Sequence, residues 1–348
     1  MYEFFTGGGC PPGELPRGLA TEAFGMLWAL LADFRRWGVV RTITALDARF
    51  EQCIPGLDRR TLPADEIVCA LPGEHEDVYL SLLKRCDAVL LIAPETNDIL
   101  AALTLHAESA GIPVLGSGAS AAATAGDKEV CARLFRQANL PIPETRAASF
   151  ASATQVVKQM GCPLVIKPVD GIGSEGVCRV ERLTDLPAIL ETVRKVTTHD
   201  RVLIQSLAGG VAVSASLLVA EGRCLALSLN RQLMGTGFQY RGSHVPMQHP
   251  ESAGAMKLAC SGASLIPGLR GYVGIDMVLS EDAVLLIEIN PRITTSYIAL
   301  RQVIRLNLAQ AIWEACRNGI LPECIPLAGH ATIIKDTPQT WGLGIDPV

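Results

Sequence analysis

The sequence lacks features that would assign it at once to several large protein classes. No apolar run reaches the roughly 18 residues of a membrane span, and the first residues lack the basic and apolar segments of a secretory signal. The eleven cysteines show no C-x-x-C spacing, and most lie in apolar runs where thiols pack as small hydrophobic groups. The 30 basic residues do not outnumber the 35 acidic ones, so no nucleic-acid surface is expected. We therefore expect a soluble, cytoplasmic protein with reduced cysteines.

What the chain does have is the length and composition of several packed units. At 348 residues and 49% hydrophobic content it is too long for one typical core. Short strand-like segments alternate with helical ones up to residue 115, which predicts an α/β unit with a parallel sheet. Small residues at 116–118 mark a boundary. We expect an N-terminal α/β domain, two further α+β units and a tail of little pattern, over residues 1–117, 118–204, 205–330 and 331–348.

A pair of segments late in the chain predicts a β-hairpin that carries a metal site. Glu288 and Asn290 alternate with apolar residues and should leave one face of a strand, because side chains in a strand repeat with a period of two. Residues 274–279 form an earlier apolar segment, and the polar turn after it would return the chain as a neighbour and bring Asp276 beside the other two. Carboxylate and amide oxygens suit Mg²⁺. A lone strand-end Asp would more simply face solvent.

A glycine-rich loop between two predicted strands suggests phosphate binding. Residues 164–168 end in Lys167-Pro168, and the loop Gly171–Gly176 leads into the next strand. The backbone amides of this loop could close over phosphates. The loop lacks the Gly-Lys-Ser/Thr of a Walker loop. Without other evidence, the simplest interpretation of the loop is a structural hairpin. Lys128, at the start of a predicted helix, opposes the helix dipole, which an anionic ligand would remedy.

Other candidates rest on weaker patterns, and each could equally serve packing. Arg231 follows a buried strand and could stabilise an oxyanion or face solvent. Residues 234–249 have little pattern and are interpreted as a substrate-facing loop. Residues 94–97 follow a strand at the edge where α/β sheets bind ligands, unless Asp98 simply caps the next helix. The further candidates for a substrate pocket are Tyr240, Arg241, Thr295, Tyr297, Gly8 and Gly9.

Taken in order, these motifs resemble the ATP-grasp fold. The resemblance is carried by Lys128, Lys167-Pro168, the glycine loop, Asp276 and Glu288-x-Asn290-Pro291-Arg292, and it extends from residue 118 to 319 after a preceding α/β domain. It implies activation of a carboxylate by ATP as an acyl phosphate, with Mg²⁺ (two ions, Mn²⁺ being an alternative), and displacement of the phosphate by an amine. The implied nucleotide contacts are Lys128, Lys167, Gly171, Gly173, Ser174, Gly176, Gln205, Ser206 and Leu207. The implied metal ligands are Asp276, Glu288 and Asn290, with Arg231 and Arg292 at the transferred group.

A narrower resemblance concerns residues 4–9, 228–232 and 290–297. They look like the tyramine–glutamate ligase group of methanofuran biosynthesis, which implies joining the γ-carboxylate of glutamate to tyramine, or to tyrosine where methylofuran is made. It also implies small-molecule partners and a homodimer. The chain departs from the family at Val211-Ala212-Val213, where a Glu commonly binds the ribose. One alternative is a different ligase, resembling the lysine ligase of the pyrrolysine pathway or D-alanine–D-alanine ligase. Another is a catalytically silent nucleotide-binding regulatory protein.

Overall fold

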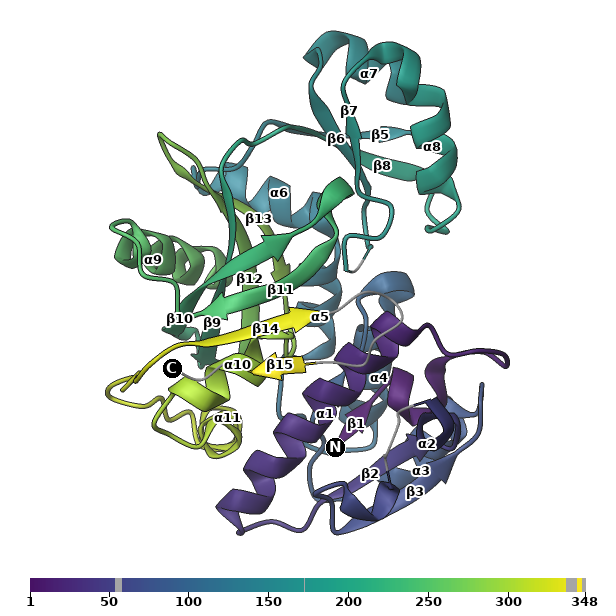
Figure 1. Cartoon of the computed structure of the whole chain (residues 1–348), viewed down its shortest axis with the longest axis vertical. Coiled ribbons are helices and arrows are strands. Elements are labelled where there is room, and N and C mark those ends of the chain that lie inside the picture. Colours follow the sequence, from purple (N-terminus) through teal and green to yellow (C-terminus); the bar gives the residue numbers. More distant parts are fainter. Residues whose placement is uncertain (54–57, 172, 336–342, 346–348) are drawn as a thin grey trace.

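A computed structural model describes residues 1–53, 58–171, 173–335 and 343–345. The N-terminal part is a small α/β unit in which β1 pairs with β4 and β2 with β3, and both pairs are parallel, as the alternating pattern predicted (Figure 1). Among the described residues they form two separate two-stranded sheets and not the one parallel sheet that was expected. Helix α1 ends at Gly38, whose left-handed backbone lets its N–H bond Phe34 O. The elements are β1 (Tyr2–Glu3), α1 (Arg17–Trp37), β2 (Ile43–Asp47), α2 (Arg49–Cys53), β3 (Glu66–Ala70), α3 (His75–Leu83), β4 (Leu91–Ile92) and α4 (Ile99–Ser109).

The middle part is built around a four-stranded antiparallel sheet in the order β5-β8-β6-β7. Helices α7 and α8 pack on it around a core that includes Ile166 and Ile204, and this unit stands apart at the top of Figure 1. Its elements, with the two helices that precede them, are α5 (Ala119–Gly126), α6 (Lys128–Gln137), β5 (Thr145–Ser149), α7 (Ala153–Met160), β6 (Leu164–Pro168), β7 (Cys178–Val180), α8 (Leu186–Arg194) and β8 (Arg201–Ser206).

The C-terminal part is a seven-stranded antiparallel sheet in the order β13-β12-β9-β10-β11-β14-β15. The predicted hairpin is its edge: β12 and β13 pair antiparallel with Asp276 opposite Glu288. The elements are β9 (Val211–Ala220), β10 (Arg223–Met234), β11 (Tyr240–Val245), α9 (Ser252–Ala263), β12 (Gly271–Leu279), β13 (Val284–Asn290), α10 (Ser296–Val303), α11 (Leu308–Arg317), β14 (Ala331–Lys335) and β15 (Leu343–Ile345).

Helices cover both faces of this large sheet. Alternate residues of β9 face opposite sides, so Leu218 joins a core with α1, α10 and α11, while Leu217 joins one with α5, α6 and α9. Helix α1 belongs to the N-terminal unit yet packs against α10 and α11 (Figure 1). The large sheet that carries Asp276 and Glu288 is therefore packed against both of the other parts of the chain.

Two stretches that were expected to lack regular structure form strands. Residues 240–245, inside the predicted loop 234–249, are β11, and residues 331–335 and 343–345 of the predicted tail are β14 and β15. Strand β14 pairs with β11, and the two strands come from distant parts of the sequence. Their strand structure depends on this pairing, which a local sequence pattern does not show. Residues 336–342 and 346–348 of that tail lie outside the described residues. Within the described residues no helix is long and apolar enough to cross a membrane.

The start of α6 makes a stability prediction. Asp127 caps the helix, since its Oδ1 accepts hydrogen bonds from Glu129 N at 2.9 Å and Val130 N at 3.0 Å. We expect Asp127→Ala to lower the free energy of unfolding by about 1 kcal/mol in urea denaturation, the usual cost of a lost N-cap. Glu251→Ala is the matched control, because Glu251 stands at the N-cap of α9 without a capping bond. Equal losses in the two variants would contradict the capping role.

Candidate functional site

A cavity of about 610 Å³ lies where the three parts of the chain meet. Strands β12 and β13 supply Asp276, Glu288 and Asn290 to its wall, and the segment after β13 supplies Arg292. Lys128 reaches it from the start of α6. The N-terminal unit closes another side with residues of β1, α1 and the loop after β4. The cavity therefore collects side chains from segments that are far apart in the sequence.

The predicted metal residues lie together on the wall of this cavity. Asp276 and Glu288 are direct partners across β12 and β13, so their side chains leave the same face of the hairpin. Asn290 Nδ2 donates to Asp276 Oδ2 at 3.2 Å, and Gln232 Nε2 donates to Asp276 Oδ1 at 2.9 Å. The period of two and the short turn thus predicted the juxtaposition correctly. The role of these residues as metal ligands stays a prediction.

The charges around this hairpin are concentrated and buried. Lys128 Nζ lies 3.2 Å from Glu288 Oε2, and both side chains are at most one-fifth exposed. Burial, and after it the Glu288 carboxylate, raise the pKa of Asp276. Burial would also raise the pKa of Glu288, but Lys128 and Lys167 lower it overall. Burial lowers the pKa of Lys167 to about 8. The ion pair with Glu288 also offsets the unfavourable position of Lys128 at the start of α6.

This donor set fits a hard divalent cation. Asp276 and Glu288 are adjacent buried carboxylates whose mutual repulsion a cation would relieve, and Asn290 adds an amide oxygen once its side chain turns. Among the described residues no three His, Cys, Asp or Glu side chains cluster as a metal site. Two carboxylates and an amide suit Mg²⁺, which keeps several waters and shares substrate phosphates, better than zinc.

The glycine loop between β6 and β7 forms part of the cavity wall. Gly171, Gly173 and Ser174 line the cavity, and so does Lys167 from β6. Gly173 and Ser174 have positive φ of 58° and 65°. Gly176 does not line the cavity. Its φ is +71° and a Cβ there would come within 2.5 Å of Val196 Cγ2, so glycine is required for the turn. Ile172 of this loop lies outside the described residues.

The end of β8 supplies the residues predicted to meet adenine. Gln205, Ser206 and Leu207 line the cavity, and Gln205 Nε2 is fixed by a 2.8 Å bond to Thr145 Oγ1. The family commonly has a ribose-binding Glu where this chain has Val211-Ala212-Val213. Ala212 of this segment lines the cavity, and its side chain is not polar. Ser214 is a neighbouring hydroxyl on the same wall. The nucleotide roles of these residues stay predictions.

Arg292 is held by a partner that the sequence did not reveal. Its Nε and Nη2 donate to Glu95 Oε1 and Oε2 at 2.9 and 3.1 Å, and Nη1 donates to Ile293 O at 3.2 Å. Burial alone would lower the pKa of Arg292, but Glu95 raises it overall. Glu95 follows β4, at the edge where a ligand site was predicted. Asp98, the proposed helix cap, makes no capping bond.

Arg231 does not reach the cavity. It lies within β10, which continues to Met234, and it pairs in register with His244. Its neighbour Gln232 lines the cavity and bonds Asp276, so the exposed Arg231 side chain leaves the opposite face of the strand. The strand is longer than its apolar pattern predicted, since β10 continues past Leu229 to Met234. Side chains two residues apart in a strand share a face, so extending the strand from Ser228 and Asn230 places Gln232 on the same face as these two residues.

The candidate substrate residues divide into two groups. Tyr240 and Thr295 line the cavity. Tyr297 does not: it is fully buried and its hydroxyl donates to Asp33 Oδ2 at 2.8 Å, so it belongs to the core between α1 and α10. Arg241 is the extra residue of a bulge opposite Leu233 and Met234, lies beside Gly235 and is not part of the lining.

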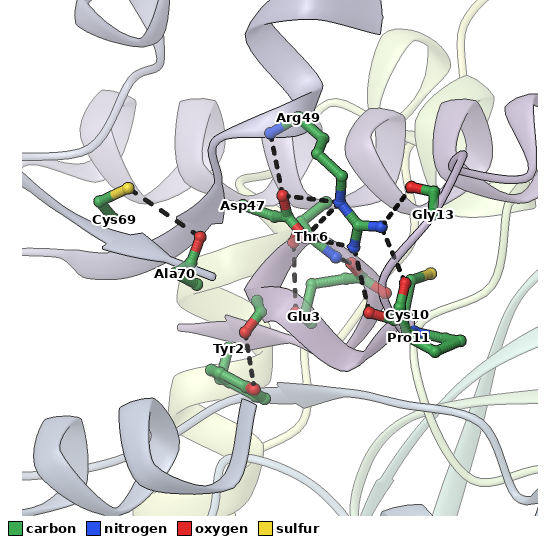
Figure 2. A network of polar contacts seen from close by, with 11 residues as sticks. Tyr2, Glu3, Thr6, Cys10, Pro11, Gly13, Asp47, Arg49, Cys69 and Ala70 are labelled. Atoms are coloured by element: carbon green, nitrogen blue, oxygen red, sulfur yellow. Dashed lines mark hydrogen bonds and ion pairs between the residues drawn. The ribbon is translucent and has the colours of Figure 1, made fainter. Parts of the chain in front are cut away.

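Gly8 and Gly9 lie in a short π-helical turn, Phe5–Gly9, and do not line the cavity. Gly8 has a φ of +94°, and a Cβ there would lie 2.7 Å from Leu71 O. The following loop is held by the chain itself. Figure 2 shows Arg49 donating to Asp47 Oδ2 at 2.6 Å and to the carbonyls of Cys10, Pro11 and Gly13 at 2.8 to 3.0 Å. The glycines therefore allow close packing of the chain on itself and are not part of a substrate pocket in this structure.

Several ligases are similar in sequence to this chain. A tyramine–L-glutamate ligase of Methanocaldococcus jannaschii is 32% identical over 232 residues, which are 66% of this chain and 64% of the relative. A D-alanine–D-alanine ligase of Desulforudis audaxviator is 31% identical over 56% of this chain and 72% of its own length. The chain spans a little under two thirds of the length of the tyramine–L-glutamate ligases that it matches.

Solved structures share the fold at lower identity. A biotin carboxylase complex with β,γ-ATP from Campylobacter jejuni superposes with a TM-score of 0.76 at 16% identity, covering 89% of this chain and 73% of that one. The biotin carboxylase domain of a 2-oxoglutarate carboxylase from Hydrogenobacter thermophilus, solved with MgADP, gives 0.75 at 15% identity, over 89% and 72%. Family models describe residues 40–122 as a pre ATP-grasp 3 domain and residues 125–296 as an ATP-grasp domain. The chain therefore belongs to the ATP-grasp family.

Proposed function

We propose that the chain joins the γ-carboxylate of L-glutamate to the amine of tyramine or tyrosine at the expense of ATP. The observation that carries the proposal is the convergence of Lys128, Lys167 and Arg292 with the acidic hairpin in one cavity. Phosphoryl transfer needs mainly positioning and charge neutralisation, which buried cations and a metal site supply together. The names of the relatives that are about 30% identical support the choice of glutamate and a phenolic amine.

The proposed reaction has two steps. A carboxylate oxygen of glutamate attacks the γ-phosphorus of ATP, the bond from this phosphorus to the bridging oxygen breaks, and ADP leaves. The amine nitrogen then attacks the acyl carbon, the carbon–oxygen bond to phosphate breaks, and the amine loses a proton as the amide forms. Mg²⁺, held by Asp276, Glu288 and Asn290, would neutralise phosphate charge when bound.

Each part of the cavity has a task in this scheme. Lys128 and Lys167 neutralise the nucleotide phosphates, and the glycine loop closes over them and excludes water. The guanidinium of Arg292 keeps N–H groups beyond those used by Glu95 and Ile293, and these stabilise the transferred phosphoryl group. The amide product is of the kind that a methanofuran- or methylofuran-type C1 carrier contains, which is the pathway that the proposal implies.

ADP release with defined substrates tests the proposal. The purified protein is given ATP, Mg²⁺ and L-glutamate with tyramine, with tyrosine or with no amine, and the products are weighed by mass spectrometry. We expect release that depends on one phenolic amine, and transfer of one ¹⁸O from carboxylate-labelled glutamate to phosphate. D-Alanine alone is the comparison substrate, because a D-alanine–D-alanine ligase has nearly the same sequence identity to this chain as the tyramine–L-glutamate ligases. ADP release with D-alanine and none with glutamate would overturn the substrate assignment.

A further inference from the structure

A pair of opposite charges lies on a part of the cavity wall that the proposed chemistry does not use. Glu22 comes from α1 and Lys335 is the last residue of β14, and both line the cavity. Lys335 Nζ forms an ion pair with Glu22 Oε1, and Thr295 Oγ1 donates to Glu22 Oε2 at 3.3 Å. Gly18 of α1 makes room for the lysine, since a Cβ there would lie 3.3 Å from Lys335 Cε. The three side chains form one cluster, here named the head-group cluster.

The head-group cluster differs from a second charged link made by the same helix. Asp33 of α1 pairs with Arg301 of α10 at 2.8 Å, and the Asp33 side chain is 1% exposed. That pair is sealed in the core and needs nothing more to explain it. The side chains of Glu22 and Lys335 remain 19% and 28% exposed and face the cavity. A solute in the cavity can therefore reach the pair Glu22–Lys335, but not the pair Asp33–Arg301.

A buried hydroxyl lies in the same cavity as the head-group cluster and the acidic hairpin. Tyr240 lines the same cavity, and its Oη has no hydrogen-bond partner among the described residues. Chiefly burial, and also the carboxylates of Glu22 and Asp276, raise the pKa of Tyr240, while the neighbouring Ser243 side chain opposes the shift. A buried donor without a partner is costly, so a bound molecule with an acceptor would be favoured at this point.

These groups match an amino acid that reacts through its side chain. We propose that Glu22 holds the α-ammonium and Lys335 the α-carboxylate of the acid substrate, whose side-chain carboxylate then points to Arg292. The inference rests on the proposed function, because it deepens the identity of the activated acid. Substrate charges of opposite sign exchange with the existing ion pair, so neither residue is left buried and unpaired on binding. This arrangement selects the γ-carboxylate over the α-carboxylate for phosphorylation.

Two truncated substrates separate the two contacts. 4-Aminobutyrate keeps the reacting carboxylate and the amine but lacks the α-carboxylate, and glutarate lacks the amine. We expect Lys335→Gln to lower kcat/KM for L-glutamate roughly 10- to 100-fold through KM, the effect of one charge-assisted hydrogen bond. The same variant should leave kcat/KM for 4-aminobutyrate and KM for ATP unchanged. Glu22→Gln should show the corresponding pattern with glutarate, and Lys335→Arg should restore part of the loss.

Lys195→Gln is the matched control, because Lys195 forms an exposed ion pair with Glu191 outside the cavity. Melting temperatures of all variants separate unfolding from lost recognition. If Lys335→Gln keeps the wild-type preference for glutamate over 4-aminobutyrate, the inference falls and the proposed function stands. If the wild type releases no ADP with glutamate, the proposed function falls. Calorimetric titration of L-glutamate then decides the inference, which survives only if the wild type binds it and Lys335→Gln does not.

Discussion

We expect Glu288→Gln to reduce ADP release by roughly a thousandfold, the loss seen when a charge-stabilising group is removed from a reaction centre. Glu288 is one of two carboxylates on the hairpin and the direct partner of Lys128. The amide keeps the shape of the side chain but loses the negative charge, so both Mg²⁺ affinity and the position of Lys128 should suffer. The measurement is the rate of ADP release with saturating ATP, Mg²⁺ and substrates.

The variant should stay folded, because glutamine fills the same space and Asp276 remains beside Lys128. Circular dichroism and a thermal melt check this. Glu281→Gln is the matched control, since Glu281 lies exposed in the turn of the same hairpin. Unchanged turnover in Glu288→Gln would contradict the assignment of Glu288 as a Mg²⁺ ligand. A wild-type protein that binds ATP but releases no ADP with any amino acid would instead support the regulatory alternative.

The hairpin could be predicted because its geometry is local. Alternation places Glu288 and Asn290 on one face, and a short polar turn returns the chain, so few arrangements of Asp276 are possible. The glycine loop and the start of α6 follow the same logic. In each case the residues that matter lie within one supersecondary unit, and the order of these units along the chain carried the resemblance to the family.

The remainder of the site depends on contacts between distant segments. Glu95 and Arg292 are 197 residues apart in the chain, and Glu22 and Lys335 are 313 apart. No local pattern in a single sequence shows that residues so far apart will meet in the fold, so neither pair was predicted. Tyr297 was misjudged for the same reason, because only the packing of α1 on α10 shows that its hydroxyl meets Asp33. The error on Arg231 was different, since it came from ending β10 before its pairing with β11 was known.

We expect Arg292→Lys to lower kcat by roughly a hundredfold or more, while KM for ATP changes little. The guanidinium of Arg292 binds Glu95 through two nitrogens and still presents N–H groups to the cavity. A lysine carries its donors on one nitrogen and cannot hold Glu95 in this planar fashion while also meeting the phosphoryl group. Its positive charge still neutralises the buried Glu95, so the fold should survive, which a thermal melt can verify.

Arg231→Ala is the matched comparison, because sequence reasoning proposed Arg231 and Arg292 for the same task. Arg231 is exposed on the face of β10 opposite Gln232, so we expect this variant to keep kcat within about twofold, as is usual for surface substitutions. Single-turnover measurements of ADP formation separate the chemical step from product release. Comparable losses in both variants would mean that β10 rearranges during the reaction and turns Arg231 toward the substrate. A loss confined to Arg292→Lys would assign the charge at the transferred group to the guanidinium that Glu95 holds, and would make the contact between the N-terminal unit and the large sheet a requirement for catalysis.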